Sequence, residues 1–360
     1  MPVEFIGIAH TADQSETITQ VGPAVQPDYL YRLAVAHEQS GFDRVLVAHS
    51  SSMPDGFIVA DQILNATIRL GVLLAHRPGF IAPTVAARKF ATIDAFHPGR
   101  IALHVITGGD DADQARDGDF TDKQTRYRRT DEFLEVVQRE WSSAEPFDYD
   151  GEFYRVAGAR SALRPGHLPV YFGGASADAV RVGGRHADVY AFWGEPLAGI
   201  RQRMAEVRAS AAAAGRSIDR FSVSLRPIAA ATETAAWQRA RQLLELTRER
   251  AAEFAGDRDT TQAEGSRRLL RYAAAAEVHD KRLWTPLSAA TGAAGNSTAL
   301  VGSYEQVAES LLDYVAVGAT TLLIRGYDPL ADAAAYASLI RLVHEQVGDD
   351  IEGYRARVAA

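Results

Sequence analysis

The chain has 360 residues, of which 47% are hydrophobic and 23% are charged, and its formal net charge is −8. This acidic balance argues against a nucleic-acid-binding protein, which normally presents a basic face, but it allows a small anionic ligand in a locally basic pocket. The sequence has no cysteine, which excludes disulfides, thiolate nucleophiles, iron–sulfur clusters and cysteine-ligated zinc.

Short apolar runs alternate with longer amphipathic segments along the chain. The first run is followed by a predicted helix over Asp28–Ser40, which Gly41 ends. Pro83 suits the start of a helix over Thr84–Ala95, and further helices are expected around Tyr127–Gln138 and Ala331–Val347. Eight strands are predicted: Val3–Ile8, Arg44–Ala48, Ile68–Leu74, Arg100–Thr107, Val170–Phe172, Val189–Trp193, Phe221–Leu225 and Leu322–Arg325.

The alternation of strands and helices predicts an α/β fold with a parallel sheet, and eight units favour a closed (β/α)8 TIM barrel over an open doubly wound sheet. Such a barrel takes roughly 250 residues, so we expect a single domain over residues 1–360 with insertions at about 142–167 and 251–297. The second insertion precedes the last helix–strand unit. It is charged at first and later rich in glycine and alanine, which is typical of a mobile loop.

Targeting and membrane signals are missing from the sequence. Met1–Gln14 lacks the basic stretch, apolar core and cleavage site of a signal peptide, and no apolar run approaches the roughly 20 residues that cross a bilayer. We therefore expect a cytoplasmic protein that binds neither a membrane nor nucleic acid.

Residues at the carboxyl ends of the strands are the candidates for chemistry, because barrel active sites lie on the loops that follow the strands. These positions are rich in histidine and arginine, which indicates a basic, aromatic mouth. They are His10, His49, Ser50, His76, Arg77, Thr107–Asp110, Gly173–Ser176, Trp193–Glu195, Arg226, Arg325 and Tyr327.

The turn Gly173–Ser176 follows a predicted strand and opens a helix. Glycines allow backbone N–H groups to approach an anion, and Ser176 could cap a helix whose positive end attracts phosphate. A plain tight turn with a serine cap explains the same residues equally well.

Elsewhere, the sequence has no Walker motif, no Gly-x-Gly-x-x-Gly after the first strand, no His-Glu-x-x-His and no Gly-x-Ser-x-Gly. We expect no metal site.

Several segments together resemble the flavin-dependent alkanesulfonate monooxygenases of the bacterial luciferase-like superfamily. They occur in one order and at compatible spacing from about His10 to the final helix. The segments are Arg77–Pro78, Ala82–Arg88, Ala91–Asp94, Gly99–Arg100, Val105–Asp110, Asp117–Gly118, Arg126–Tyr127, Tyr171–Ser176, Trp193–Pro196, Thr298–Gly302 and Gly326–Tyr327.

The resemblance implies an enzyme that binds reduced FMN (FMNH2), supplied by a separate NAD(P)H-dependent FMN reductase. With O2 it would cleave the C–S bond of a small anionic organosulfonate to give sulfite and an aldehyde. It also implies a homodimer or homotetramer. The residues divide into three groups: His10, Trp193, Arg226 and Tyr327 as catalytic residues on the substrate side; Thr107, Tyr127, Gly174, Ala175 and Ser176 as cofactor ligands; and His76, Arg77 and Arg325 as substrate ligands.

The sequence departs from the alkanesulfonate pattern at five positions. Met53 replaces a cysteine, Arg226 replaces a histidine, and Ala175 replaces the first serine of the phosphate turn. The arginine of the mobile loop aligns near Ala293, and Lys123 stands where many superfamily members have histidine. These changes suggest an anionic substrate that is held differently, for which the planar fork of arginine is suited.

Three other functions fit the same sequence. One is an FMNH2-dependent oxygenation of a substrate without a sulfonate. The second is an oxidoreductase that uses the deazaflavin F420 and needs no oxygen, and the third is a non-catalytic flavin-binding barrel. Oxygen dependence and product formation distinguish these from C–S cleavage.

Overall fold

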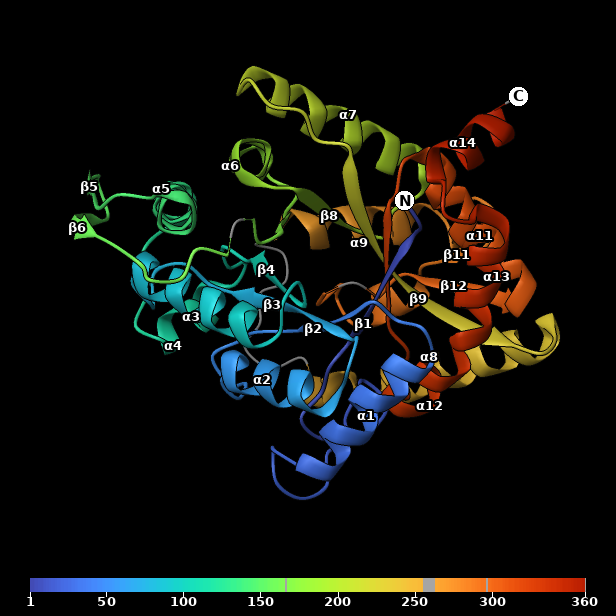
Figure 1. Ribbon diagram of the computed structural model, residues 1–360. Coiled ribbons are helices and arrows are strands. Elements are labelled where there is room, and N and C mark those ends of the chain that lie inside the picture. The colour runs from blue at the N-terminus through green and yellow to red at the C-terminus, as the bar shows by residue number, and fades with distance from the viewer. Residues whose placement is uncertain (166, 255–262, 296, 360) are drawn as a thin grey trace.

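Eight parallel strands close into a barrel in the computed structural model, which describes residues 1–165, 167–254, 263–295 and 297–359 (Figure 1). Their order around the barrel is β1-β2-β3-β4-β7-β8-β9-β13, and β13 pairs with β1 to close the circle. The predicted fold class and all eight predicted strands are confirmed. The strands are β1 Glu4–Ile8, β2 Arg44–Val47, β3 Gly71–His76, β4 Ile101–Val105, β7 Val170–Gly173, β8 Val189–Trp193, β9 Arg220–Ala230 and β13 Thr321–Ile324.

Helices surround the barrel and bury the outer faces of its strands. Pro27 and Pro83 lie in the first turns of α1 and α3, where a missing N–H costs nothing. The side chain of Asp122 caps α5 by accepting a hydrogen bond from the Thr125 N–H. The helices are α1 Pro27–Gln39, α2 Gly56–Ala66, α3 Pro83–Phe96, α4 Asp111–Arg116, α5 Lys123–Ser142, α6 Ala177–His186, α7 Leu197–Ala213, α11 Tyr304–Val317 and α14 Ile351–Ala359.

The closing helix was predicted as one segment over Ala331–Val347, but the chain breaks it into α12 (Pro329–Ala335) and α13 (Ala337–Val347). The break lies at the buried Tyr336, whose hydroxyl donates to the carbonyl of Pro227 on β9 at 2.7 Å. A tertiary contact therefore overrides a continuous helical pattern. Among the described residues, no helix is both long enough and apolar enough to cross a membrane.

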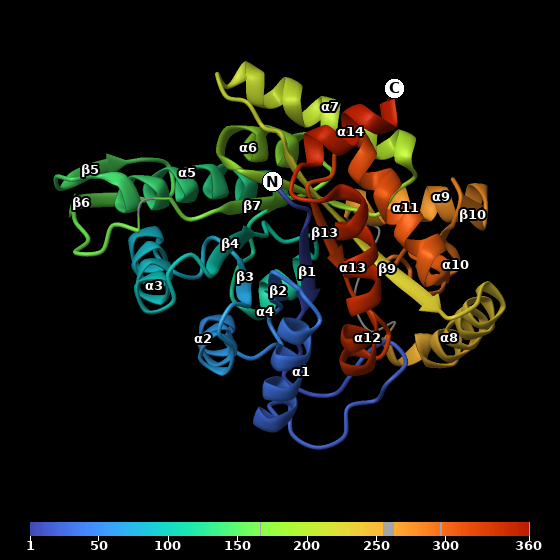
Figure 2. The same cartoon turned by 45° about the vertical axis from the view of Figure 1, so that its right-hand side comes forward.

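The first insertion, residues 142–167, contains an antiparallel hairpin of β5 (Phe147–Asp150) and β6 (Arg155–Ala159). Phe147 and Ala159 of this hairpin pack on Val136 of α5. Figure 2 shows the hairpin beside α5, to one side of the barrel.

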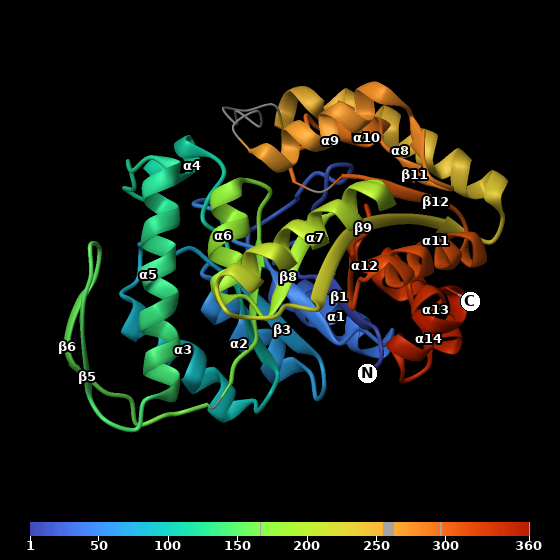
Figure 3. The same cartoon turned by 90° about the horizontal axis from the view of Figure 1, so that it is seen from above.

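The second insertion, predicted as a loop, is largely helix and strand where it is described. It contains α9 (Glu264–Ala275), β10 (Val278–His279), β11 (Leu283–Trp284) and α10 (Pro286–Ala290). This segment is folded because the apolar side chains of Trp284 and Leu287 pack in one cluster with residues of α8 (Glu233–Phe254) and β12 (Ala299–Ser303). The expected mobility falls partly on residues 255–262, which lie outside the described residues. Figure 3 shows α8, α9 and α10 on the side of the barrel opposite the N-terminus.

A polar network closes the amino-terminal end of the barrel below an apolar layer that includes Ile6 and Leu73. Glu4 lies at its centre and accepts hydrogen bonds from Arg44 Nε at 3.0 Å and the Tyr171 hydroxyl at 2.6 Å. The hydroxyl of Thr321 also donates to Glu4, at 3.0 Å. These contacts join β1 to β2, β7 and β13, so one carboxylate fixes strands that are far apart in sequence.

We predict that Glu4→Ala lowers the free energy of unfolding by about 2–4 kcal/mol, because it leaves a largely buried arginine and two hydroxyls without their acceptor. Urea unfolding at pH 7 would measure the change. The matched control is Glu309→Ala, which removes an exposed partner of Lys281 and should cost less than about 1 kcal/mol. Equal effects of the two substitutions would contradict the role assigned to Glu4.

Candidate active site

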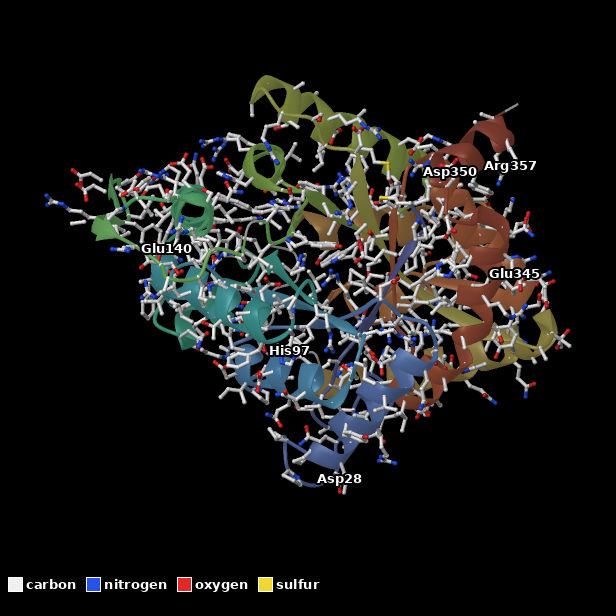
Figure 4. All side chains as sticks on the ribbon, in the orientation of Figure 1. Asp28, His97, Glu140, Glu345, Asp350 and Arg357 are labelled. Atoms are coloured by element: carbon white, nitrogen blue, oxygen red, sulfur yellow. The ribbon has the colours of Figure 1, made fainter. Side chains whose placement is uncertain are left out.

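A cavity of about 1000 Å³ opens at the carboxyl ends of the barrel strands, at the upper end of the range usual for ligand pockets. The described lining includes six arginine or lysine side chains and three glutamates. The cavity is therefore basic in a chain whose net charge is −8. Acidic residues such as Asp28, Glu345 and Asp350 lie instead on the outer helices and their connections (Figure 4).

One wall of the cavity is the turn between β7 and α6, as the sequence predicted. Gly174, Ala175 and Ser176 line the cavity together with Tyr127 from α5. Gly174 has φ +152°, and a Cβ there would lie 2.5 Å from the Cβ of Ala179, so only glycine fits. Ser176 caps α6 by accepting from the Ala179 N–H at 3.3 Å. These donors suit a phosphate: they are the amino terminus of a helix, a serine, a tyrosine hydroxyl, and backbone that a glycine leaves accessible.

Another part of the cavity holds a cluster of three charges, two from strand ends and one from the loop after β1. Arg226, after the barrel part of β9, donates from both terminal nitrogens to Glu16, at 2.7 and 2.9 Å. Arg325, after β13, donates to the same carboxylate at 3.1 Å. Two guanidinium groups thus share one carboxylate.

The electrostatics of this cluster are dominated by burial and mutual attraction. Burial alone would raise the pKa of Glu16, but Arg226 and Arg325 outweigh it and hold that pKa far below its usual value. Burial and the neighbouring charge of Arg226 lower the pKa of Arg325, with Glu16 opposing them. An additional anion beside Arg325 would therefore be stabilised.

His10, at the end of β1, lines the cavity beside this cluster. Burial and then the charge of Arg325 lower its pKa from 6.5 to about 4. The imidazole is therefore neutral at pH 7 and can both donate and accept a hydrogen bond. Thr107 and Trp193 also lie in the lining, as predicted.

Arg77 lines the cavity, but its charge is already paired. Its Nη2 donates to Asp113 at 2.5 Å, and Asp113 also accepts from the backbone and hydroxyl of Ser51 at 3.2 and 2.6 Å. Arg77 thus joins the loops after β2 and β3 to α4. This arrangement fits a structural clamp better than the predicted substrate ligand.

Two predicted site residues lie outside the cavity lining. His76 packs against the rings of Phe57, Phe90 and Phe133, with its ring stacked on Phe133 at a centroid distance of 5.4 Å. Burial lowers its pKa to about 3. Tyr327 lies beneath Arg226, whose guanidinium carbon is 3.6 Å from the ring centroid. Both rings therefore pack behind the cavity wall and support the residues that line it.

The other positions that depart from the alkanesulfonate pattern lie in the cavity lining or next to it. Met53 and Lys123 line the cavity. Ala293 is buried with φ +52° and accepts a hydrogen bond from the Ser266 hydroxyl at 2.9 Å. Its neighbours Thr291, Gly292 and Ala294 reach the lining.

Sequence reasoning missed several charged residues of the site, among them Glu16, Asp113 and Arg203. Glu16 lies inside the long loop after β1, and Asp113 lies in a short helix, so neither follows a strand directly. Arg203 is in the middle of α7 and reaches the cavity. Only the acidic residues of the segments after β1 and β4 could have indicated partners for the predicted arginines. Among the described residues, no group of three potential metal ligands gathers in one place.

Comparisons with known proteins agree with this architecture. Residues 4–321 match the family model described as luciferase-like monooxygenase. A riboflavin lyase, solved with modified FMN and riboflavin, aligns with a TM-score of 0.77 and 19% identity over 98% of this chain and 94% of that one. An EDTA monooxygenase from Chelativorans sp. BNC1 aligns with a TM-score of 0.77 and 17% identity over 99% and 98%. An F420-dependent secondary alcohol dehydrogenase gives 0.71 and 16% over 95% and 99%. At these identities the structural matches establish a shared fold.

The lowered pKa values of His10 and His104, both about 4, predict an acid-sensitive fold. Above pH 6.5 neither the folded nor the unfolded state is protonated at these rings. As the pH falls from 6.5 to 4 the unfolded chain binds protons first, so the free energy of unfolding should fall by on the order of 2–3 kcal/mol per histidine and then level off. Urea unfolding across this range would measure it. His10→Gln should reduce the fall, and an unchanged slope in this variant would contradict the assignment.

Proposed function

This chain belongs to the luciferase-like monooxygenase family and is a flavin-dependent monooxygenase, and we propose that it uses reduced FMN and O2 to cleave the C–S bond of a small organosulfonate. The observation that carries the substrate class is the cluster of Arg226, Glu16 and Arg325. The cluster lines a cavity large enough for a flavin and a second small molecule. Burial and the charge of Arg226 lower the pKa of Arg325, so a sulfonate beside it would be stabilised.

The turn at Gly174–Ser176 and the hydroxyl of Tyr127 would hold the FMN phosphate, and Thr107 would lie near the flavin ring. When bound, reduced FMN would supply the two electrons that reduce one oxygen atom of O2 to water. The reaction then balances as sulfonate, O2 and reduced FMN giving aldehyde, bisulfite, FMN and water. Each turnover consumes one reduced flavin, so the proposal includes a separate NAD(P)H-dependent FMN reductase as partner.

On the substrate side, Arg325 would bind the sulfonate oxygens and Trp193 would provide an apolar wall. His10 would respond to this binding, because the charge of Arg325 is the second largest cause of its lowered pKa. Neutralising that charge raises the proton affinity of the imidazole. His10 would then accept the proton that the carbon next to sulfur loses as it becomes the aldehyde carbon.

We also propose that the protein forms a homodimer or homotetramer. Exposed apolar side chains on α2 and α3 support it, namely Ile58, Val85 and Phe96. Scattered apolar residues are common on protein surfaces, but these three lie on adjacent helices that follow β2 and β3.

We predict sulfite release when the protein, reduced FMN and O2 are combined with at least one member of a panel of alkyl, aryl and sugar sulfonates. Sulfite and aldehyde would be quantified together with oxygen uptake, with catalase present to remove peroxide. Equal amounts of sulfite and aldehyde, with no sulfite under anaerobic conditions, are expected. Oxygen-dependent oxidation of another substrate without sulfite would refute the sulfonate assignment. Turnover with F420 in the absence of oxygen would refute the monooxygenase reaction, and flavin binding without any product would indicate a non-catalytic barrel.

Replacing Arg325 should separate substrate binding from flavin binding. Arg325→Gln removes the positive charge of this side chain, so we expect the KM for the sulfonate to rise about tenfold or more, in line with the loss of a charge-assisted hydrogen bond. The affinity for FMN should change less than about twofold, since the phosphate turn is on other strands. Steady-state kinetics and flavin fluorescence would measure the two quantities. Arg116→Gln, at a half-exposed arginine of α4, is the control, and an unchanged KM in Arg325→Gln would remove that residue from the substrate site.

A further inference from the structure

The carbonyl oxygen of Gly174 receives two buried donors from outside the phosphate turn. Nη2 of Arg203 on α7 donates to it at 2.5 Å, and the hydroxyl of Tyr190 on β8 donates at 3.0 Å. Both side chains are buried. Two converging hydrogen bonds fix the plane of the peptide that joins Gly174 to Ala175.

Fixing that carbonyl also fixes the direction of the next N–H. None of the described peptide bonds is cis, and in a planar trans peptide the C=O and N–H point in opposite directions. The N–H of Ala175 therefore points away from Arg203 and Tyr190. Ala175 itself lines the cavity and lies directly before the helix-capping Ser176.

Arg203 is held in turn by a second charge. Its Nη1 lies 3.5 Å from Glu195, which is only 2% exposed. The same carboxylate accepts from Arg268 Nε at 2.7 Å and Nη2 at 2.5 Å. A buried carboxylate with two guanidinium partners is costly to break from either side, because the remaining charges stay out of water.

Arg268 connects this network to the second insertion, because it belongs to α9. The start of α9 lies directly on the cavity. A Cβ on Gly265 would lie 2.9 Å from the ring of Trp193, so the helix approaches that ring as closely as a glycine allows. A chain of contacts therefore runs from α9 through Arg268, Glu195 and Arg203 to the phosphate turn.

We propose that Arg203 is a positioning residue for the flavin phosphate, and that Arg268 acts on the same group through Glu195 and Arg203. The inference rests on the proposed FMN site. Arg203 holds the Gly174–Ala175 peptide so that the Ala175 N–H faces the phosphate, and α9 strengthens this hold when Arg268 binds Glu195. Contact between α9 and the barrel thereby raises the affinity for the phosphate end of the flavin and not for its ring.

The alternative is that Arg203 only stabilises the fold. Its guanidinium carbon lies 5.0 Å from the ring centroid of Phe192, so packing alone could account for its burial. A purely structural role would lower stability in the variants. It would leave the ratio of FMN affinity to riboflavin affinity unchanged, because riboflavin differs from FMN only by lacking the phosphate.

The test measures the binding of FMN and riboflavin to the full-length protein, oxidised and, under anaerobic conditions, reduced. We expect Arg203→Met to weaken FMN binding about tenfold and Arg268→Gln about three- to fivefold, with riboflavin binding changed less than about twofold. In the double variant, Arg268→Gln should add nothing to the effect of Arg203→Met, because it acts through that residue. Arg271→Gln is the matched control, since Arg271 lies on the same helix but pairs with Glu264 at 3.3 Å.

Each outcome separates this inference from the function on which it rests. A wild-type protein that binds FMN and riboflavin equally would overturn the proposed phosphate site. A wild-type protein that prefers FMN, with variants that keep the same preference, would overturn only the positioning role. Should Arg203→Met fail to fold by urea unfolding, Tyr190→Phe removes the other donor to the Gly174 carbonyl without touching a charge. It should weaken FMN binding about threefold and leave riboflavin binding unchanged.

Discussion

Arginines buried at the mouth of the barrel need carboxylate partners, and this requirement sets the positions of the loops around the cavity. A buried guanidinium that loses its partner keeps an uncompensated charge in a medium of low dielectric constant. Glu16 brings the loop after β1 to the ends of β9 and β13, and Asp113 brings α4 to the loop after β3. Glu195 brings α7 and α9 to the end of β8. Ion pairs between segments from different parts of the chain therefore help to hold the cavity walls together.

The same requirement explains what the sequence could and could not predict. The barrel follows from local patterns, since eight apolar runs separated by helical segments leave few other folds, and residues that end those runs had to gather at one rim. The place of the Gly173–Ser176 turn on the cavity was predictable for that reason. The partners of the arginines were not, because Arg226 and Glu16 are 210 residues apart and no local pattern joins them. The aromatic cage of His76 likewise comes from helices that only the fold brings together.

The second insertion shows the limit of composition as a guide. Its glycine- and alanine-rich end was consistent with a loop, yet Trp284 and Leu287 carry enough apolar surface to pack against α8 and β12. Two large side chains outweighed the polar residues around them, because burial of each contributes roughly 2–3 kcal/mol. The barrel strand β9 continues past the rim to Ala230 to pair with β12, and β12 in turn pairs with β11 of the insertion.

The two parts of the cavity share one electrostatic arrangement. Arg226, Glu16 and Arg325 form one group of two arginines and one glutamate, and Arg203, Glu195 and Arg268 form another. The first group lies beside the proposed substrate anion, and the second holds the Gly174 carbonyl through Arg203. A glutamate between two arginines lowers the cost of burying them without cancelling their attraction for an anion. An anionic substrate beside Arg325 would be stabilised, because burial and Arg226 disfavour the charged form of that side chain. The second group would act on the flavin phosphate by fixing the peptide that follows Gly174.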